Sequence, residues 1–173
     1  MIMKPRKIPF TQMHSTTPNA NLKGFLLRNK IKFEFLEKIQ TKHAIEAAQA
    51  THLNLREIAK TLVFVDENRQ PFIVILSADR EVNRHSLQRI TGKKTVQLAD
   101  ERLAEHLTGY PTGGIPPIGH KRTFPVFIDK SILANEHVWC GGGARSKLVK
   151  LQVQDIVKLT QGKVHEFSNH PKK

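Results

Sequence analysis

Apolar positions alternate with charged ones in some segments of the chain and form unbroken runs in others, and both patterns predict strands. Residues 31–35 alternate apolar and charged side chains, which is typical of a half-buried strand. Residues 60–65 and 72–76 are apolar runs separated by the polar segment 66–70, an arrangement that predicts a β-hairpin. Further short strands are predicted over residues 95–98, 126–129, 138–140, 148–153 and 164–167.

Helices are predicted where a polar residue that can cap a first turn precedes apolar positions at helical spacing. Asn19 or Asn21 is a candidate cap for a helix through residues 25–27, and Thr41 for a helix over residues 44–50. Further helices are predicted over residues 53–59, 83–90 and 99–107, and a helical turn over 155–159. The mixture, without a repeat or a long linker, predicts a single α+β domain with a mixed central sheet flanked by helices.

The composition fits one folded domain. The chain has 173 residues, of which 39% are hydrophobic and 25% charged. Its longest apolar runs, residues 62–65 and 72–76, are far shorter than the roughly 20 residues that span a bilayer, so a membrane protein is not expected. The single cysteine, Cys140, excludes an internal disulfide framework and fits the reducing cytoplasm, where we expect the protein to act.

The charge balance favours a polyanionic partner. The chain has 28 Lys and Arg against 15 Asp and Glu, a formal net charge of +13, and nucleic acid is the usual partner of such a surplus. The alternative is a basic surface that keeps the protein soluble. The first acidic residue is Glu34, and residues 1–18, broken by prolines, are predicted to be an irregular basic arm. This arm either contacts a phosphate backbone, forms an inert tail, or is an organellar transit peptide.

Several kinds of chemistry are not supported by the sequence. The nine histidines never form a His-x-x-x-His pair and Cys140 has no cysteine partner, so no metal site is expected. The run of residues 141–147 fits neither the phosphate-binding loop nor the dinucleotide-binding pattern, and no Gly-x-Ser-x-Gly elbow is present. We therefore expect no cofactor.

Two segments do suggest a site. Residues 109–120 contain four glycines and three prolines, which predicts a stiff loop whose backbone a ligand can approach. The N–H groups of Gly113, Gly114 and Ile115 could hold a carbonyl oxygen or a developing oxyanion; the alternative is a tight structural connection. Lys60 begins an apolar strand, where it either extends its ammonium group to solvent or supplies a positive charge for a phosphate or carboxylate.

These motifs, taken in order, resemble the YbaK family of free-standing aminoacyl-tRNA editing domains. The resemblance covers roughly residues 24–167 and rests on residues 46–48, Lys60-Thr61-Leu62, residues 109–119, 127–129 and the pair Gly141-Gly142. It implies a barrel-like mixed sheet and a domain over residues 19–168, followed by a tail over 169–173. It also implies deacylation of mischarged aminoacyl-tRNA, most typically Cys-tRNA(Pro) or another small amino acid on tRNA(Pro), with prolyl-tRNA synthetase as a candidate partner.

The resemblance also implies roles for individual residues. Lys60 would anchor a phosphate or ribose at the tRNA 3′ end, and the loop from Gly113 to Pro117 would present its amides to the ester. The expected substrate-binding residues besides Pro117 are His43, Thr61, Cys140, Gly141 and Gly142. Cys140 stands where the family commonly has a serine, and residues 143–147 differ from the family's usual stretch. Both departures bear on which amino acid is accepted.

A mechanism without a protein nucleophile would explain why no catalytic triad is visible. The aminoacyl ester is activated by the neighbouring ribose hydroxyl, so Lys60 would fix the terminal adenosine while the loop amides polarise the carbonyl and water completes hydrolysis. A cysteinyl substrate could instead attack with its own thiol. Two alternatives remain: a non-catalytic module that binds the tRNA acceptor end or recruits a synthetase, and a protein that binds a small carboxylate.

Overall fold

The computed structural model describes residues 20–172, so the predicted arm over residues 1–18 lies outside the described residues. The described part is an α+β domain, as predicted. Its α-helices are α1 (Leu22–Arg28), α2 (Ala44–Thr51), α3 (Arg84–Thr91), α4 (Glu101–Thr108) and α5 (Val153–Thr160). Its strands are β1 (Phe33–Glu37), β2 (Ala59–Asp66), β3 (Pro71–Ser77), β4 (Glu81–Val82), β5 (Val96–Leu98), β6 (Val126–Asp129), β7 (His137–Gly141), β8 (Lys147–Gln152), β9 (Lys163–His165) and β10 (Ser168–Asn169).

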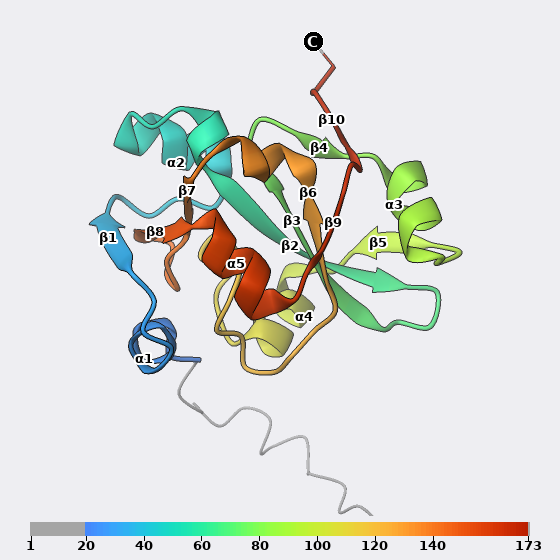
Figure 1. Ribbon diagram of the computed structural model, residues 1–173, viewed down its shortest axis with the longest axis horizontal. Coiled ribbons are helices and arrows are strands. Elements are labelled where there is room, and N and C mark those ends of the chain that lie inside the picture. Colours follow the sequence, from blue (N-terminus) through green and yellow to red (C-terminus); the bar gives the residue numbers. More distant parts are fainter. Residues whose placement is uncertain (1–19, 173) are drawn as a thin grey trace, which may run out of the picture.

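A five-stranded sheet in the order β5-β2-β3-β6-β9 forms the centre of the molecule (Figure 1). The β2–β3 hairpin is antiparallel and pairs Lys60 with Leu76, whereas β3–β6 and β6–β9 are parallel. The sheet is therefore mixed, as predicted. The hairpin loop is fixed by Asp66, whose carboxylate accepts hydrogen bonds from the N–H groups of Asn68 and Gln70, each at 2.9 Å.

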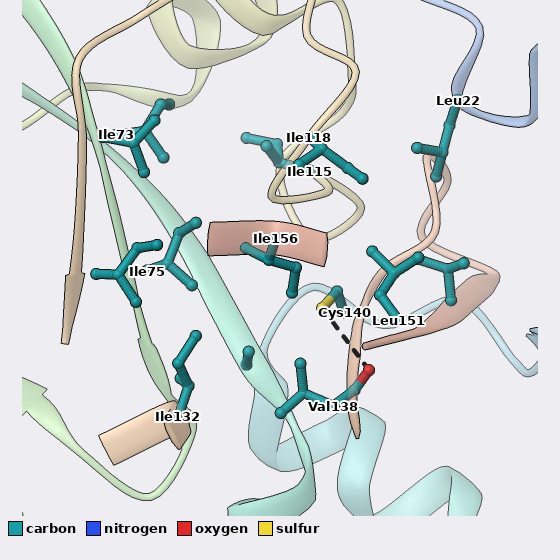
Figure 2. Packing of buried hydrophobic residues seen from close by; sticks show 14 of the residues in the cluster. Leu22, Ile73, Ile75, Ile115, Ile118, Ile132, Val138, Cys140, Leu151 and Ile156 are labelled. Atoms are coloured by element: carbon teal, nitrogen blue, oxygen red, sulfur yellow. Dashed lines mark hydrogen bonds between the residues drawn. The ribbon is translucent and has the colours of Figure 1, made fainter. Parts of the chain in front are cut away.

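The other strands form a three-stranded antiparallel sheet, β1-β8-β7, and a short pair, β10-β4. A parallel bridge between Ile58, which directly precedes β2, and Trp139 on β7 links the two larger sheets. Helix α5 crosses in front of the central strands (Figure 1). The main core lies between these layers and contains fully buried Ile75 on β3, Leu151 on β8 and Ile156 on α5 (Figure 2).

Polar caps fix the start of the helices that follow the hairpin. Asn83 begins α3 and Asp100 begins α4, where their side chains accept hydrogen bonds from Ser86 N–H at 3.0 Å and Leu103 N–H at 2.8 Å. Helix α4 ends at Gly109, whose φ of 83° is the left-handed conformation typical of a helix end. The glycine-rich loop therefore leaves directly from the end of α4.

Three details differ from the sequence predictions. The N-cap of α2 is His43 rather than Thr41, and the predicted helix over residues 53–59 is a 3₁₀ turn, Leu55–Glu57, before β2. Strands β4 and β10 were not predicted, because each has two residues and gives no pattern to detect. Their pairing places Asn169 in a strand opposite Glu81, within the segment expected to be a tail.

Asp129, at the end of β6, ties the C-terminal segment to the central sheet. The side chain is buried, and its carboxylate accepts hydrogen bonds from Ser131 N–H at 3.0 Å, Phe167 N–H at 2.8 Å and the Ser168 hydroxyl at 2.7 Å. Burial alone would raise the pKa of this carboxyl, but these hydrogen bonds outweigh burial and hold the pKa below its ordinary value.

We expect Asp129→Asn to lower the free energy of unfolding by about 1.5–3 kcal/mol at neutral pH, because an amide replaces an ionised acceptor. Since the folded pKa is depressed, the stabilisation by the carboxylate is present above the unfolded pKa of about 4 and is lost as pH falls through the folded value. Urea denaturation of both proteins near neutral pH and near pH 3 should show the difference shrinking. A difference that stays constant with pH would contradict the assignment.

Candidate active site

A cavity of about 540 Å³ lies between α2, β2, the start of α4 and the glycine-rich loop. Lys60 and Thr61 reach it from β2, His43 from the start of α2, Gly113 and Ile115 from the loop, and Gly141 from the end of β7. Much of the remaining wall is small and apolar, with alanines at positions 44, 47, 59, 99 and 104. The expected site residues that the structure brings together in this cavity are up to 98 positions apart in the chain, from His43 to Gly141.

Lys60 is a basic group set among the apolar residues of the wall, which Lys42 and Arg80 also line. Burial lowers the pKa of its ammonium group below the ordinary value, and the nearby carboxylates of Glu81 and Asp79 partly offset this effect. Among residues 20–172, no carboxylate lies within 4.0 Å of the Lys60 ammonium group. A partly desolvated cation without a close partner is suited to bind an anionic or strongly polar ligand.

The backbone of the loop lies in direct contact with two other segments of the chain. Gly113 has a φ of 90°, and a Cβ built on it would lie 2.8 Å from the Cα of Lys42. A Cβ on Gly141 would lie 2.4 Å from the carbonyl oxygen of Ile115. Glycine is required at both positions because the backbones approach too closely for a side chain. The loop is therefore held between the segment that precedes α2 and the segment that follows β7.

The amides of the loop are not equally available. Gly114 N–H donates to the Pro111 carbonyl at 2.9 Å and closes a turn, and the Gly114 carbonyl accepts from Gly143 N–H at 2.8 Å. Among the described hydrogen bonds of residues 20–172, none uses the N–H of Gly113 or Ile115. Of the three amides expected to hold a carbonyl oxygen, two are available and that of Gly114 is already engaged.

Three expected substrate-binding residues do not line the cavity. Pro117 is buried, and Gly142 lines a separate hollow of about 440 Å³ with Tyr110 and Lys147. The Cys140 side chain is completely buried in the core, near Val138 and Leu151 (Figure 2), and burial raises the pKa of its thiol. Cys140 therefore has the environment of a small apolar core residue and not that of a wall residue of this cavity.

Several residues of the cavity belong to no pattern that sequence analysis detects. Lys42 and Glu101 form an ion pair across the rim between α2 and α4. Thr112, which precedes Gly113, also lines the cavity. The side-chain hydroxyls of Thr61 and Thr112 are the two buried side-chain groups within residues 20–172 that have no hydrogen-bond partner. Buried hydroxyls without partners are costly, and their presence at one cavity indicates groups kept for a ligand.

We expect Thr61→Val to raise the free energy of unfolding by roughly 1 kcal/mol, because it removes an unpartnered hydroxyl from a strand position that suits a β-branched residue. A matched control is Thr91→Val, since the Thr91 hydroxyl donates to the Leu87 carbonyl at 2.7 Å and its loss should be destabilising. Urea denaturation measures both changes. A destabilised Thr61→Val protein would mean that this hydroxyl is satisfied in solution.

Neither a metal-ligand cluster nor a membrane-spanning helix is found among residues 20–172. Within residues 20–172, no group of three or more His, Cys, Asp or Glu side chains is placed to hold a metal ion. The helices in this part of the chain are also too short or too polar for any of them to cross a bilayer.

Comparison with known proteins identifies relatives of both sequence and structure. Residues 39–159 match the family model described as "Aminoacyl-tRNA editing domain". A protein of Enterococcus faecalis named "Putative Cys-tRNA(Pro)/Cys-tRNA(Cys) deacylase EbsC" is 26% identical over 79% of this chain and 84% of its own length. The proline–tRNA ligase of Geotalea daltonii is 29% identical over 66% of this chain, which corresponds to 20% of that enzyme.

Two solved structures share the fold. The hypothetical protein APE2540 is 27% identical with a TM-score of 0.78, covering 86% of this chain and 99% of its own. A protein described as a "putative trans-editing enzyme for prolyl tRNA synthetase" is also 27% identical, with a TM-score of 0.73, covering 86% of this chain and 94% of its own.

Proposed function

This chain belongs to the aminoacyl-tRNA editing domain family and is a trans-editing deacylase of the YbaK type, and we propose that its substrate is Cys-tRNA(Pro) or another small amino acid on tRNA(Pro). The formal net charge of +13 suits an RNA substrate. The largely apolar wall of the cavity suits an uncharged amino-acid side chain. Prolyl-tRNA synthetase is the candidate partner, because related domains occur within proline–tRNA ligases.

The observation that carries the proposal is that Lys60 and Gly113 line the same cavity. In the proposed complex the Lys60 ammonium group binds the terminal nucleotide of the tRNA. The Gly113 and Ile115 N–H groups, which have no acceptor among the described residues, donate to the carbonyl oxygen of the ester. His43 and Thr61 would contact the substrate at the side of the cavity formed by α2 and β2.

The proposed reaction needs no nucleophile from the protein. Water attacks the ester carbonyl carbon, and the negative charge that develops on the carbonyl oxygen is stabilised by the two amides. The bond from that carbon to the ribose oxygen then breaks, the ribose oxygen takes a proton, and the amino acid leaves. The neighbouring ribose hydroxyl assists water, so the protein contributes mainly orientation and electrostatic stabilisation.

Lys60→Ala should lower the single-turnover rate of deacylation roughly ten- to hundredfold, because a charge-assisted hydrogen bond of about 1.5–3 kcal/mol is lost. A matched control is Lys32→Ala, an exposed lysine outside the cavity. Rates are measured with enzyme in excess over Cys-tRNA(Pro). An unchanged rate for Lys60→Ala would reject the role of Lys60.

A substrate panel tests the function itself. Purified protein is assayed with tRNA(Pro) charged with Cys, Ala, Ser, Thr or Pro, and with Cys-tRNA(Cys). Each assay is run in the presence and in the absence of prolyl-tRNA synthetase. Hydrolysis of Cys-tRNA(Pro) with correctly charged Pro-tRNA(Pro) left intact is expected. Tight binding of uncharged tRNA without cleavage of any ester would instead identify a non-catalytic acceptor-end module.

The pH dependence of the rate follows from the environment of Lys60. Burial lowers the Lys60 pKa, so the charged form required for binding is lost as pH rises through a value below the ordinary 10.5. Glu81 raises this pKa, and Glu81→Gln should therefore move the alkaline fall in rate to lower pH. The exposed Glu34 provides the control Glu34→Gln. Rates are corrected for uncatalysed ester hydrolysis, and a shift to higher pH in Glu81→Gln would contradict the assignment.

A further inference from the structure

Thr112, at the start of the loop, is held from both sides by one pair of charged residues. The Arg145 guanidinium donates from Nε to the Thr112 carbonyl at 2.7 Å, and the Thr112 N–H donates to the Glu105 carboxylate at 3.0 Å. Arg145 Nη2 and Glu105 Oε1 are themselves 3.5 Å apart. The pair therefore forms a clamp around Thr112, with Glu105 on α4 and Arg145 in the turn between β7 and β8.

Among the polar groups of two successive peptide units, the clamp leaves one without a partner in the described part of the chain. The unit that joins Pro111 to Thr112 is fully used, because its carbonyl accepts from Gly114 N–H and its N–H donates to Glu105. The unit that joins Thr112 to Gly113 uses its carbonyl on Arg145. Among the hydrogen bonds described for residues 20–172, the Gly113 N–H alone of these four groups has no partner.

The planarity of the peptide bond turns this contact into a constraint on the Gly113 N–H. The chain contains no cis peptide bond among its described residues, so the Thr112 carbonyl and the Gly113 N–H point in opposite directions within the same peptide plane. Arg145 fixes the carbonyl and thereby fixes the direction of the N–H. A cation bound to the carbonyl also polarises the unit, which makes its N–H a stronger donor.

The anchor is itself immobilised through its backbone. The Arg145 carbonyl accepts from Thr41 N–H at 3.1 Å and from the Lys38 ammonium group. Thr41 and Lys42 are also the residues whose backbone lies closest to Gly113. The turn that carries Arg145, the segment before α2 and the glycine-rich loop are therefore joined into one unit.

We propose that Arg145 and Glu105 are positioning residues for deacylation, which act by orienting and polarising the peptide unit that carries the Gly113 N–H. The inference rests on the proposed function, in which this N–H donates to the ester carbonyl. Neither residue lines the cavity, so their effect reaches the substrate only through Thr112 and Gly113. Loss of the clamp allows the peptide unit to rotate and present its carbonyl instead of its N–H.

The test compares Arg145→Ala and Arg145→Lys with Arg102→Ala, a matched loss of an exposed arginine from α4. Four quantities are measured: the single-turnover rate at saturating enzyme with Cys-tRNA(Pro) and Ala-tRNA(Pro), the Kd for uncharged tRNA(Pro), the melting temperature, and the amide NMR shift of Gly113. Arg145→Ala should lower the saturated rate about 10- to 100-fold, change Kd less than about twofold, and shift the Gly113 resonance.

Arg145→Lys should restore part of the rate, because lysine keeps the positive charge. The restoration should be incomplete, because an ammonium group lacks the planar fork with which arginine binds the Thr112 carbonyl and the Glu105 carboxylate at once. Arg102→Ala should match the wild type in rate and in the Gly113 shift. If Arg145→Ala does not fold, Glu105→Ala carries the same expectation, since it frees the Thr112 N–H and leaves Arg145 without its carboxylate.

The outcomes separate this inference from the proposed function. If the wild type hydrolyses neither ester, the proposed function fails, and the Gly113 resonance still shows whether the clamp orients the peptide. If the wild type is active and Arg145→Ala matches it in saturated rate, the inference is overturned. It is also overturned by a weaker Kd with an unchanged saturated rate, which would make Arg145 an RNA contact.

Discussion

Close contact between the backbones of three segments is the constraint on which the site depends. Residues 41–42, 113–115 and 141–144 approach one another so closely that side chains at Gly113 and Gly141 would overlap neighbouring main-chain atoms. Backbone hydrogen bonds, including that from Gly143 N–H to the Gly114 carbonyl, complete the junction. Main-chain groups held in this way have little conformational freedom, so an N–H at the junction is already oriented before a substrate arrives.

This arrangement suits a reaction whose bond is already labile. An ester activated by a neighbouring hydroxyl requires a fixed position and stabilisation of the developing charge more than it requires a strong nucleophile. The cavity offers a partly desolvated cation at Lys60 and two unengaged amides at Gly113 and Ile115. The single cysteine of the chain, Cys140, lies outside the cavity and is fully buried, so its thiol contributes to packing and not to chemistry.

The local patterns of the sequence predict the hairpin and the loop well, because both depend on neighbouring residues. They also place Lys60 on a strand, as observed. The prediction grouped Cys140 with Gly141 at the substrate, but consecutive strand residues face opposite sides: Val138 and Cys140 are buried in the core, and Gly141 reaches the cavity. The contact of Arg145 with the Thr112 carbonyl joins a peptide group to a distant residue, which no local pattern reveals. The Gly114 N–H bonds the nearby Pro111 carbonyl, but the composition of the loop does not show which of its amides closes the turn.

Helix α4 explains how the three segments are held at one place. Glu101 and Glu105 are four residues apart and therefore lie on one face of the helix. Glu101 pairs with Lys42 before α2, Glu105 pairs with Arg145 after β7, and the loop itself begins at Gly109 where the helix ends. Because these side chains are roughly one-third to one-half exposed, each ion pair adds little to stability. Their main effect is therefore geometric, since one rigid helix fixes the relative positions of both walls and the loop between them.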